Sequence, residues 1–182
     1  MTIKVFYLHG FASNFDPNSE KAQALAALGP VAGVDIDYTR DPADLLRLAG
    51  DAAAEAAPDV LVGTSMGGWL SSHLGTALRL PFVAVNPALN PADSLRKYIG
   101  EFVDYTGVKR VAEEGLIARF EPFKLGGRGL VLLDEGDEVI DHRRTVETLS
   151  GHFPIKVFPG GNHRFTHMEE ALADIRDFYY SG

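Results

Sequence analysis

Short apolar runs alternate along the chain with longer segments whose apolar residues recur at helical spacing. Near-continuous apolar runs are typical of strands buried on both faces of a parallel sheet. Six such runs occur: Ile3–Leu8, Val31–Tyr38, Val60–Val62, Phe82–Val85, Leu130–Leu133 and Ile155–Phe158. Because strands and helices alternate, the pattern predicts an α/β fold with a mostly parallel six-stranded sheet and helices on both faces. The alternating Asp35 and Asp37 place the second strand at an edge of the sheet, with one face in water.

The segments between the strands carry helix start signals. Asn18 or Ser19 can cap the first helix, and Asp41 followed by Pro42 begins the second. Before the last helix, Thr166 and Glu169 form a capping-box pattern. The apolar stripes of these three helices are Ala22, Leu25 and Leu28; Leu45, Leu46, Ala49 and Ala52; and Met168, Leu172, Ile175 and Tyr179. Such stripes predict helices that pack against the sheet.

Residues 90–128 interrupt this alternation between the fourth and fifth predicted strands. The apolar residues in the segment predict amphipathic helices: Phe102, Tyr105, Val108, Val111, Leu116, Ile117, Phe120 and Phe123. One interpretation is a small helical lid that supplies apolar walls to a substrate pocket. The alternative is a pair of helices that cover a sheet edge or meet a second subunit. Because no linker or repeat is visible, we treat residues 1–182 as a single domain.

Composition and charge narrow the class of protein. The length of 182 residues suits one domain with a substantial core. A net charge of −8 repels nucleic-acid phosphates and anionic lipid, so neither nucleic acid nor membrane is an expected partner. The absence of cysteine excludes disulfides, thiolate catalysis and Cys-ligated zinc. No signal peptide precedes the first strand and no apolar run approaches transmembrane length, so we expect a soluble cytoplasmic protein.

A glycine-flanked serine lies between the third predicted strand and a helix predicted from Met66 to about Leu78. The sequence Gly63-Thr64-Ser65-Met66-Gly67 fits the G-x-S-x-G pattern of a nucleophile elbow. In such an elbow the chain turns sharply from strand to helix, and only glycine fits beside the closely approaching backbone. Ser65 is therefore the candidate nucleophile, at the carboxyl end of a strand, where parallel sheets bind their ligands.

A serine hydroxyl needs a general base, normally a histidine that a carboxylate orients. In elbow-type sheets the order along the chain is serine, acid, histidine. Asp137 follows a glycine in the loop after the fifth strand and is the candidate acid. Asp141 fits better as the N-cap of the next helix. Glu135 and Glu138 are further alternatives that only their charge supports.

His163 is the candidate base because it alone combines a glycine-rich loop, a preceding strand end and the required chain order. Of the other histidines, His142 and His152 flank a predicted surface helix, His73 lies in the helix after Ser65, and His167 lies in the first turn of the last helix. His163 and His167 have a spacing that suits a metal. No helix holds both and no third ligand stands out, so no metal site is expected.

The same chemistry needs hydrogen-bond donors where charge develops on the carbonyl oxygen. We expect an oxyanion hole formed by the backbone amides of Met66, directly after the nucleophile, and Phe11, after the first strand. Ser13, Asn86 and Trp69 are candidate pocket residues, although Trp69 suits the core equally well. No phosphate-binding glycine motif follows the first strand, so no nucleotide and no other cofactor is expected.

Six blocks of sequence, in order along nearly the whole chain, carry a family resemblance. They are Tyr7-Leu8-His9-Gly10-Phe11 with Ser13, Gly63-Thr64-Ser65-Met66-Gly67-Gly68, Val85-Asn86-Pro87-Ala88, Asp104-Tyr105-Thr106-Gly107, Gly136-Asp137-Glu138-Val139-Ile140-Asp141 and Gly160-Gly161-Asn162-His163-Arg164-Phe165-Thr166. Together they resemble the YqiA/YcfP-type small esterases of the α/β-hydrolase superfamily. The resemblance implies a short α/β-hydrolase fold that lacks the first two strands of larger relatives. It also implies Ser65 as nucleophile, Asp137 as acid and His163 as base, with activity on short acyl esters.

The residues and the resemblance together predict a serine hydrolase, a carboxylesterase that forms an acyl-enzyme on a small acyl ester. A thioester, lactone or small amide is the alternative substrate, because the same chemistry cleaves each of these bonds. A non-catalytic protein-binding scaffold is the alternative from another class, since a fold alone does not fix function. Intact serine, acid and histidine in the required order argue against the scaffold.

Overall fold

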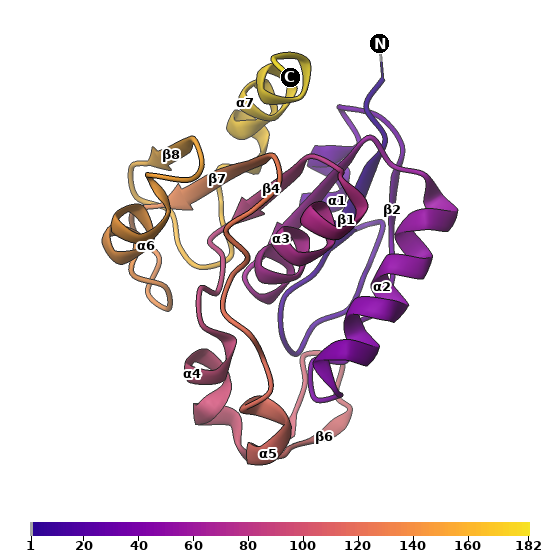
Figure 1. Ribbon diagram of the computed structural model, residues 1–182, viewed down its shortest axis with the longest axis vertical. Coiled ribbons are helices and arrows are strands. Elements are labelled where there is room, and N and C mark those ends of the chain that lie inside the picture. Colours follow the sequence, from indigo (N-terminus) through magenta and orange to yellow (C-terminus); the bar gives the residue numbers. More distant parts are fainter. Residues whose placement is uncertain (1) are drawn as a thin grey trace.

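The computed structural model describes residues 2–182, which form a six-stranded parallel sheet with helices on both sides (Figure 1). The strands lie in the order β2-β1-β3-β4-β7-β8. Their bounds are β1 Val5–Leu8, β2 Val31–Gly33, β3 Val60–Thr64, β4 Phe82–Val85, β7 Gly129–Asp134 and β8 Ile155–Phe158. The main helices are α1 Glu20–Leu25, α2 Pro42–Ala56, α3 Met66–Leu78, α6 His142–Leu149 and α7 Met168–Tyr180. The predicted α/β-hydrolase type of sheet is thus confirmed.

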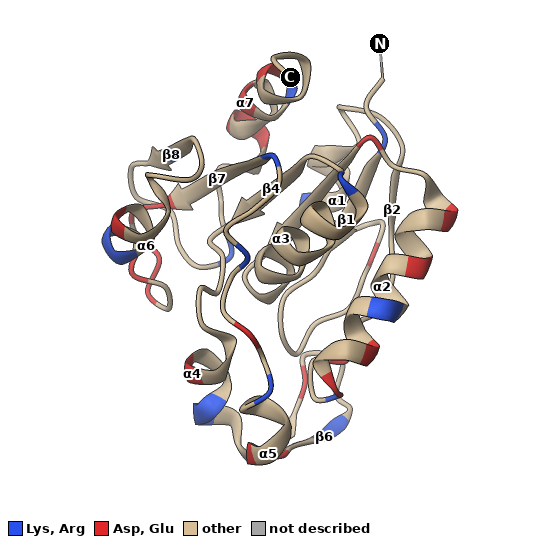
Figure 2. Ribbon diagram, viewed as in Figure 1, with Lys and Arg blue, Asp and Glu red and all other residues tan. Residues whose placement is uncertain are grey.

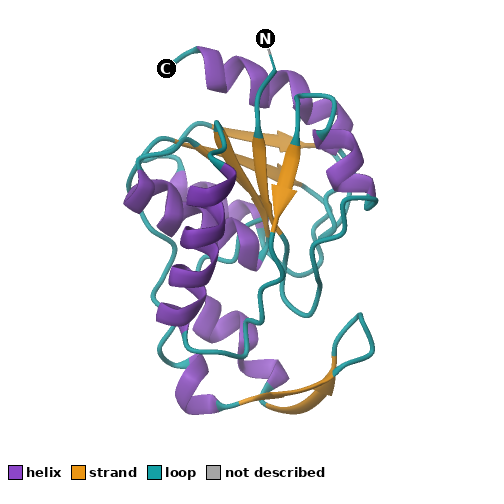
Figure 3. Ribbon diagram, turned by 90° about the vertical axis from the view of Figure 1, so that its right-hand side faces the viewer, coloured by secondary structure: helices purple, strands orange, loops and turns teal. Residues whose placement is uncertain are grey.

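Both faces of the sheet are buried, which explains the near-continuous apolar strands. In β1, Phe6 and Leu8 belong to the core cluster that also contains residues of α2, α3 and α6. Val5 and Tyr7 point to the opposite face, where α1 and α7 pack. Figure 3 shows these two sets of helices with the sheet between them.

Charged residues lie on the elements around the sheet. Both signs occur on α2 and α6, whereas the central strands β3 and β4 carry none (Figure 2). Within residues 2–182, no helix combines the length and the apolar character needed to cross a bilayer.

The strand register brings the carboxyl ends of five strands to one edge of the sheet. Leu8 pairs with Gly63, Thr64 with Val85, and Asp134 with Phe158. The loops that follow these strands therefore begin side by side, and they contain Ser65, Asp137 and His163.

The second strand lies at an edge, as predicted, but it is shorter than expected. It ends at Gly33, so Asp35 and Asp37 lie beyond it. The amide of Phe15 donates to Asp35 Oδ1 (2.7 Å), and the amide of Ile36 donates to His9 Nε2 (2.9 Å). The acidic alternation therefore belongs to a loop that binds the loop after β1, and not to the wet face of a strand.

The predicted capping box before the last helix is wrong. Helix α7 begins at Met168, and its N-cap residue, His167, makes no side-chain capping bond. Thr166 instead donates its amide to Asp134 Oδ2 over 3.0 Å. Thr166, which the local sequence predicts as a helix cap, thus binds the buried carboxylate of Asp134 at the end of β7.

The insertion is only partly helical, so the prediction of a purely helical segment is wrong. It consists of α4 Pro91–Leu95, a 3₁₀ turn Arg96–Tyr98, the antiparallel pair β5 Gly100–Val103 and β6 Lys109–Ala112, and α5 Glu114–Ile117. The hairpin lies at one end of the molecule, apart from the main sheet (Figures 1 and 3). Its turn is made by Asp104, whose Oδ1 accepts from the amides of Thr106 and Val108, each over 2.9 Å. Gly107 completes the turn with φ +84°.

The hairpin turn depends on an ionised Asp104. The Thr106 hydroxyl that donates to it, helped by Arg110 and two backbone amides, holds the pKa of this carboxyl well below its ordinary value of 3.8. A lowered folded-state pKa contributes stability that is fully present above the unfolded-state value and is lost as the pH falls through the folded-state value.

We therefore expect Asp104→Asn to lower the free energy of unfolding at pH 7. The deficit relative to the wild type should stay constant from pH 8 to pH 5 and shrink below about pH 4. Urea unfolding at a series of pH values measures it. A deficit that changes between pH 8 and pH 5 would show that another group controls the turn.

Candidate active site

Ser65 sits at a sharp turn between β3 and α3. Its backbone has φ 57° and ψ −115°, a strained conformation for a residue with a side chain. A Cβ at Gly63 would overlap the carbonyl oxygen of Gly67, and one at Gly67 would overlap that of Leu8. Two hydrogen bonds hold the turn: the Ser65 amide donates to the Val85 carbonyl (2.9 Å), and the Ala88 amide donates to the Ser65 carbonyl (3.1 Å). The motif thus adopts the strand–turn–helix geometry that it predicts.

The structure brings Ser65, His163 and Asp137 into one hydrogen-bonded chain. The Ser65 hydroxyl lies 3.0 Å from His163 Nε2, and His163 Nδ1 lies 2.9 Å and 3.0 Å from the two oxygens of Asp137. Because a carboxylate can only accept, Nδ1 carries the proton and Nε2 is left to accept from the serine. The Asp137 side chain is 1% exposed and that of His163 is 22% exposed, so the acid is shielded while the base borders solvent.

The competing acids have different partners. Glu138 Oε2 accepts from the backbone amide of His163 (3.0 Å), which lowers the pKa of that carboxyl. Asp141 is the N-cap of α6, as predicted, and accepts from the Arg143 amide (2.9 Å). Glu135 is exposed. Only Asp137 contacts the imidazole ring, although Glu138 helps to place the backbone of the same histidine.

Asp134 is a residue of the site that the sequence analysis missed. It is fully buried, and its Oδ2 accepts from the amides of Asn162 and Thr166, each over 3.0 Å. Its Oδ1 lies 2.7 Å from Nδ1 of His167, whose ring stacks on Phe158. Asp134 therefore holds both ends of the loop that carries His163. A charged residue that closes an otherwise apolar strand is the signal that would have found it.

Asn86 lies behind the site and not in an open pocket. It is 1% exposed, and its Nδ2 donates to the carbonyl of Asn162 (3.1 Å) and, more weakly, to that of His163 (3.4 Å). Its Oδ1 accepts from the Asp134 amide (2.9 Å). Asn86 thus connects the end of β4 to the histidine loop and to the end of β7, so the structure gives it a positioning role.

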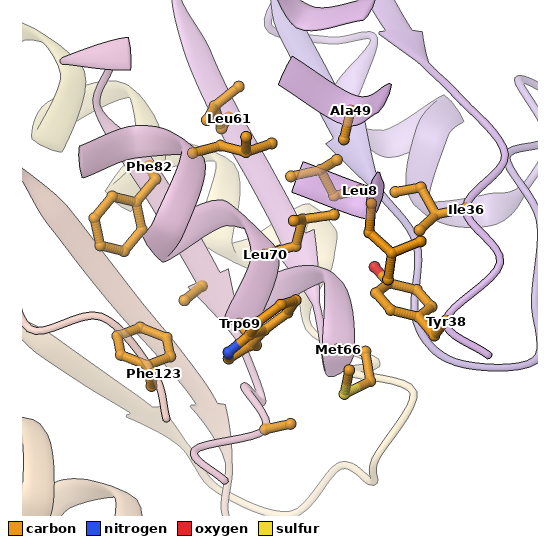
Figure 4. Close-up of a cluster of buried hydrophobic side chains, with 14 of the residues drawn as sticks. Leu8, Ile36, Tyr38, Ala49, Leu61, Met66, Trp69, Leu70, Phe82 and Phe123 are labelled. Carbon is orange, nitrogen blue, oxygen red and sulfur yellow. The ribbon is translucent and has the colours of Figure 1, made fainter. Parts of the chain in front are cut away.

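Trp69 belongs to the core. It is 1% exposed within a buried cluster that includes Met66, Leu70 and Phe123 (Figure 4). Its Nε1 donates to the Glu121 carbonyl over 2.8 Å, which binds the insertion to α3. The structure therefore places Trp69 in the core.

The loop after β1 lies close to Ser65. A Cβ at Gly10 would stand 3.5 Å from Ser65 Cβ, and the half-buried Phe11 and Ser13 follow. Within residues 2–182, the amides of Phe11 and Met66 donate to no other group of the protein. Both amides are thus available to a ligand beside the serine.

Two other histidines have structural partners. His9 Nε2 accepts from Ile36, and His73 Nε2 lies 3.0 Å from the Pro122 carbonyl. Burial lowers the pKa of both rings, so both are neutral side chains of the interior. In the part of the chain that the structure describes, no group of three or more His, Asp or Glu side chains could hold a metal ion.

The parallel sheet, the strained serine at its edge and the loop order define an α/β-hydrolase-fold protein. The family model described as "Uncharacterised protein family (UPF0227)" matches residues 4–180, and the chain belongs to this family. The family resemblance inferred from the sequence is therefore confirmed. Among its relatives, a UPF0227 protein of Shewanella sp. strain ANA-3 is 28% identical, covering 97% of this chain and 99% of its own. One from Yersinia enterocolitica is 27% identical, covering 96% and 97%.

Solved structures with the same fold include esterases and lipases. Est1E from Butyrivibrio proteoclasticus matches with a TM-score of 0.73 and 16% identity, over 99% of this chain and 88% of its own. A monoacylglycerol lipase from Paleococcus ferrophilus matches with a TM-score of 0.69 and 16% identity, over 98% and 94%. At these identities the similarity establishes the fold.

The role of Asp134 can be tested by removing its side chain. We expect Asp134→Ala to lower the free energy of unfolding by about 3 kcal/mol, because two amides of the histidine loop lose their acceptor inside the protein. The control is Asp174→Ala, which removes an exposed ion pair with Lys156 and should cost less than about 1 kcal/mol. Urea unfolding compares the two, and equal losses would contradict the role assigned to Asp134.

Proposed function

We propose that the protein is a serine hydrolase that cleaves short-chain carboxylic esters through an acyl-enzyme. The observation that carries this proposal is the continuous chain of contacts from the Ser65 hydroxyl through both ring nitrogens of His163 to Asp137. A serine, a base and a buried acid in this geometry are the parts that acyl transfer requires. The esterases and lipases among the structural neighbours support the same class of reaction.

In the first half-reaction the Ser65 oxygen attacks the ester carbonyl while His163 Nε2 accepts the hydroxyl proton. Asp137 stabilises the imidazolium that forms and keeps the ring in its orientation. The tetrahedral intermediate collapses as its C–O bond to the alcohol breaks, and His163 returns the proton to the leaving oxygen. Water then attacks the acyl-serine by the same steps, with His163 again as base, and releases the acid.

The Met66 and Phe11 amides are proposed as the oxyanion donors. Both lie beside Ser65 and, within residues 2–182, neither makes another hydrogen bond. Met66 is the first residue of the 13-residue helix α3, so the helix dipole adds positive potential where the oxyanion forms. Two preorganised donors stabilise the transition state more than the neutral ground state, which is the requirement for a rate effect.

The side chain of Phe11 packs into the aromatic residues of the insertion. Phe11 packs against Tyr98 and Phe102, with ring centroids 4.7 Å and 5.2 Å apart. The cavity bordered by Phe11, Ser13 and Phe102 has a volume of about 10 Å³, enough for about one water molecule. The insertion therefore holds the Phe11 side chain, and little empty space remains around it.

Ser65→Ala is the direct test of the nucleophile. We expect the variant to lose turnover of p-nitrophenyl acetate by at least about 10⁴-fold while its thermal unfolding stays near that of the wild type. The matched control is Ser150→Ala, which removes an exposed hydroxyl at the end of α6 and should leave the rate unchanged. Turnover that persists in purified Ser65→Ala would refute the assignment.

Asp137 and Glu138 are neighbouring acidic residues that both bind His163, the first at its ring and the second at its backbone amide. Asp137→Asn should lower kcat on the order of 10⁴-fold, because the amide favours the tautomer with its proton on the wrong nitrogen. Glu138→Gln alters a contact with the backbone amide of His163 and none with its ring, so we expect a loss below about tenfold. Steady-state kinetics on p-nitrophenyl butyrate measures both. The reverse ranking would make Glu138 the acid.

A further inference from the structure

Two identical tripeptides, Asp37-Tyr38-Thr39 and Asp104-Tyr105-Thr106, form the same local structure in distant parts of the chain. In each, one aspartate oxygen accepts from the threonine two residues later. In the first tripeptide the threonine amide and hydroxyl lie 3.1 Å and 2.6 Å from this oxygen. In the second they lie 2.9 Å and 2.6 Å from it. Each turn leaves the other carboxylate oxygen, Oδ2, free to bind a further partner.

Arg110 binds both of these remaining oxygens. Its Nε donates to Asp104 Oδ2 over 2.9 Å, and one terminal nitrogen donates to Asp37 Oδ2 over 2.6 Å. The Asp104 side chain is 3% exposed, whereas those of Arg110 and Asp37 are 33% and 27% exposed. One guanidinium thus bridges a carboxylate of the hairpin and a carboxylate of the loop after β2, and it joins the two segments.

The two joined segments both bind the backbone of the loop that follows β1. The Tyr105 amide donates to the Ala12 carbonyl over 2.9 Å, and the Tyr38 hydroxyl donates to the His9 carbonyl over 2.8 Å. The tyrosine of each tripeptide therefore binds the backbone of this loop. Phe11 lies between these two attachment points, with its ring against the aromatic residues of the insertion.

The loop needs such support because its own structure is weak. It has no strand or helix between Leu8 and Glu20, and Ala12 has φ 57°, in the left-handed region. A non-glycine residue in that region is strained. An oxyanion donor must be held to about 0.5 Å to be effective. External contacts therefore have to fix the Phe11 amide.

We propose that Arg110 is a positioning residue that fixes the Phe11 amide as an oxyanion donor by joining the hairpin to the loop after β2. This inference rests on the proposed function, because it concerns the same site. It also gives the insertion a role as a brace on the oxyanion loop, in contrast to a lid that opens and closes over the substrate.

Asp37→Asn is the variant that breaks the bridge and leaves the hairpin intact. Thr39 already occupies the first oxygen of Asp37, so an asparagine that keeps this bond turns its amide nitrogen toward the guanidinium, where two donors meet. The bond between Arg110 and Asp104 remains. Arg110→Gln removes both ion pairs and is the second variant.

The control is Arg47→Gln. Arg47 also lies between two aspartates, Asp44 and Asp51, but on the exposed face of α2. Its removal changes the net charge by the same amount as Arg110→Gln and touches no part of the site.

Kinetics with p-nitrophenyl acetate tests the catalytic consequence. Loss of a whole oxyanion donor costs about 10²–10³-fold in kcat, so a loosened donor should cost about 5–50-fold. Acylation and deacylation both use the donor and should slow by the same factor. The KM of each bridge variant should therefore stay within about twofold of the wild-type KM. The inhibition constant of a trifluoromethyl ketone, whose adduct carries an oxyanion, should rise by the same factor as kcat/KM falls. Arg47→Gln should match the wild type in all three quantities.

Hydrogen exchange of the peptide that contains Phe11 tests the structural consequence without any substrate. Exchange should be faster in Asp37→Asn and in Arg110→Gln than in the wild type and Arg47→Gln. If the wild type shows no turnover that depends on Ser65, the proposed function fails, and hydrogen exchange alone still decides whether the brace exists. Wild-type exchange in both bridge variants overturns the proposal, as does a wild-type kcat in an enzyme whose Ser65 is active. If Arg110→Gln does not fold, Asp37→Asn decides.

Discussion

The close approach of helix α3 to the ends of β1 and β3 is the constraint on which the site depends. A side chain at Gly63 or Gly67 would overlap backbone carbonyl groups, so the helix reaches this position only with glycine on both sides of the serine. The same approach forces Ser65 into its strained conformation and turns its hydroxyl toward the histidine loop. It also places the first amide of the helix beside the hydroxyl. The position of the candidate nucleophile and that of the proposed oxyanion donor thus arise from one steric condition.

The other side chains of the site are positioned by polar groups that bind the backbone of their loops. Asp134 and Asn86 bind the backbone of the histidine loop, and Glu138 binds the amide of His163 itself. The two Asp-Tyr-Thr turns bind the loop that carries Phe11, and Arg110 joins the two turns. The candidate catalytic side chains therefore lie on loops, but several hydrogen bonds from other parts of the chain hold each loop.

Much of the fold follows from local sequence, because buried parallel strands are continuous apolar runs and α3 has clear bounds. The errors share one physical cause. Asp35, Thr166 and the hairpin residues take partners that are distant in sequence, such as Phe15, Asp134 and Asp37, and no local pattern contains those partners. The same holds for the site. Ser65, Asp137 and His163 are predictable from motif and chain order, whereas Asp134 and Glu138 act on backbone groups that only the folded chain brings to them.

The central claim is that Ser65 is a hydroxyl activated by the distant His163. Incubation with a fluorophosphonate probe, digestion and mass spectrometry measure this directly, because the probe reacts with an activated serine and reports which one. The account predicts a single modified peptide that contains Ser65, and labelling that is lost in His163→Ala although that variant remains folded. Modification of a different serine, or equal labelling of Ser65 in the absence of His163, would contradict it.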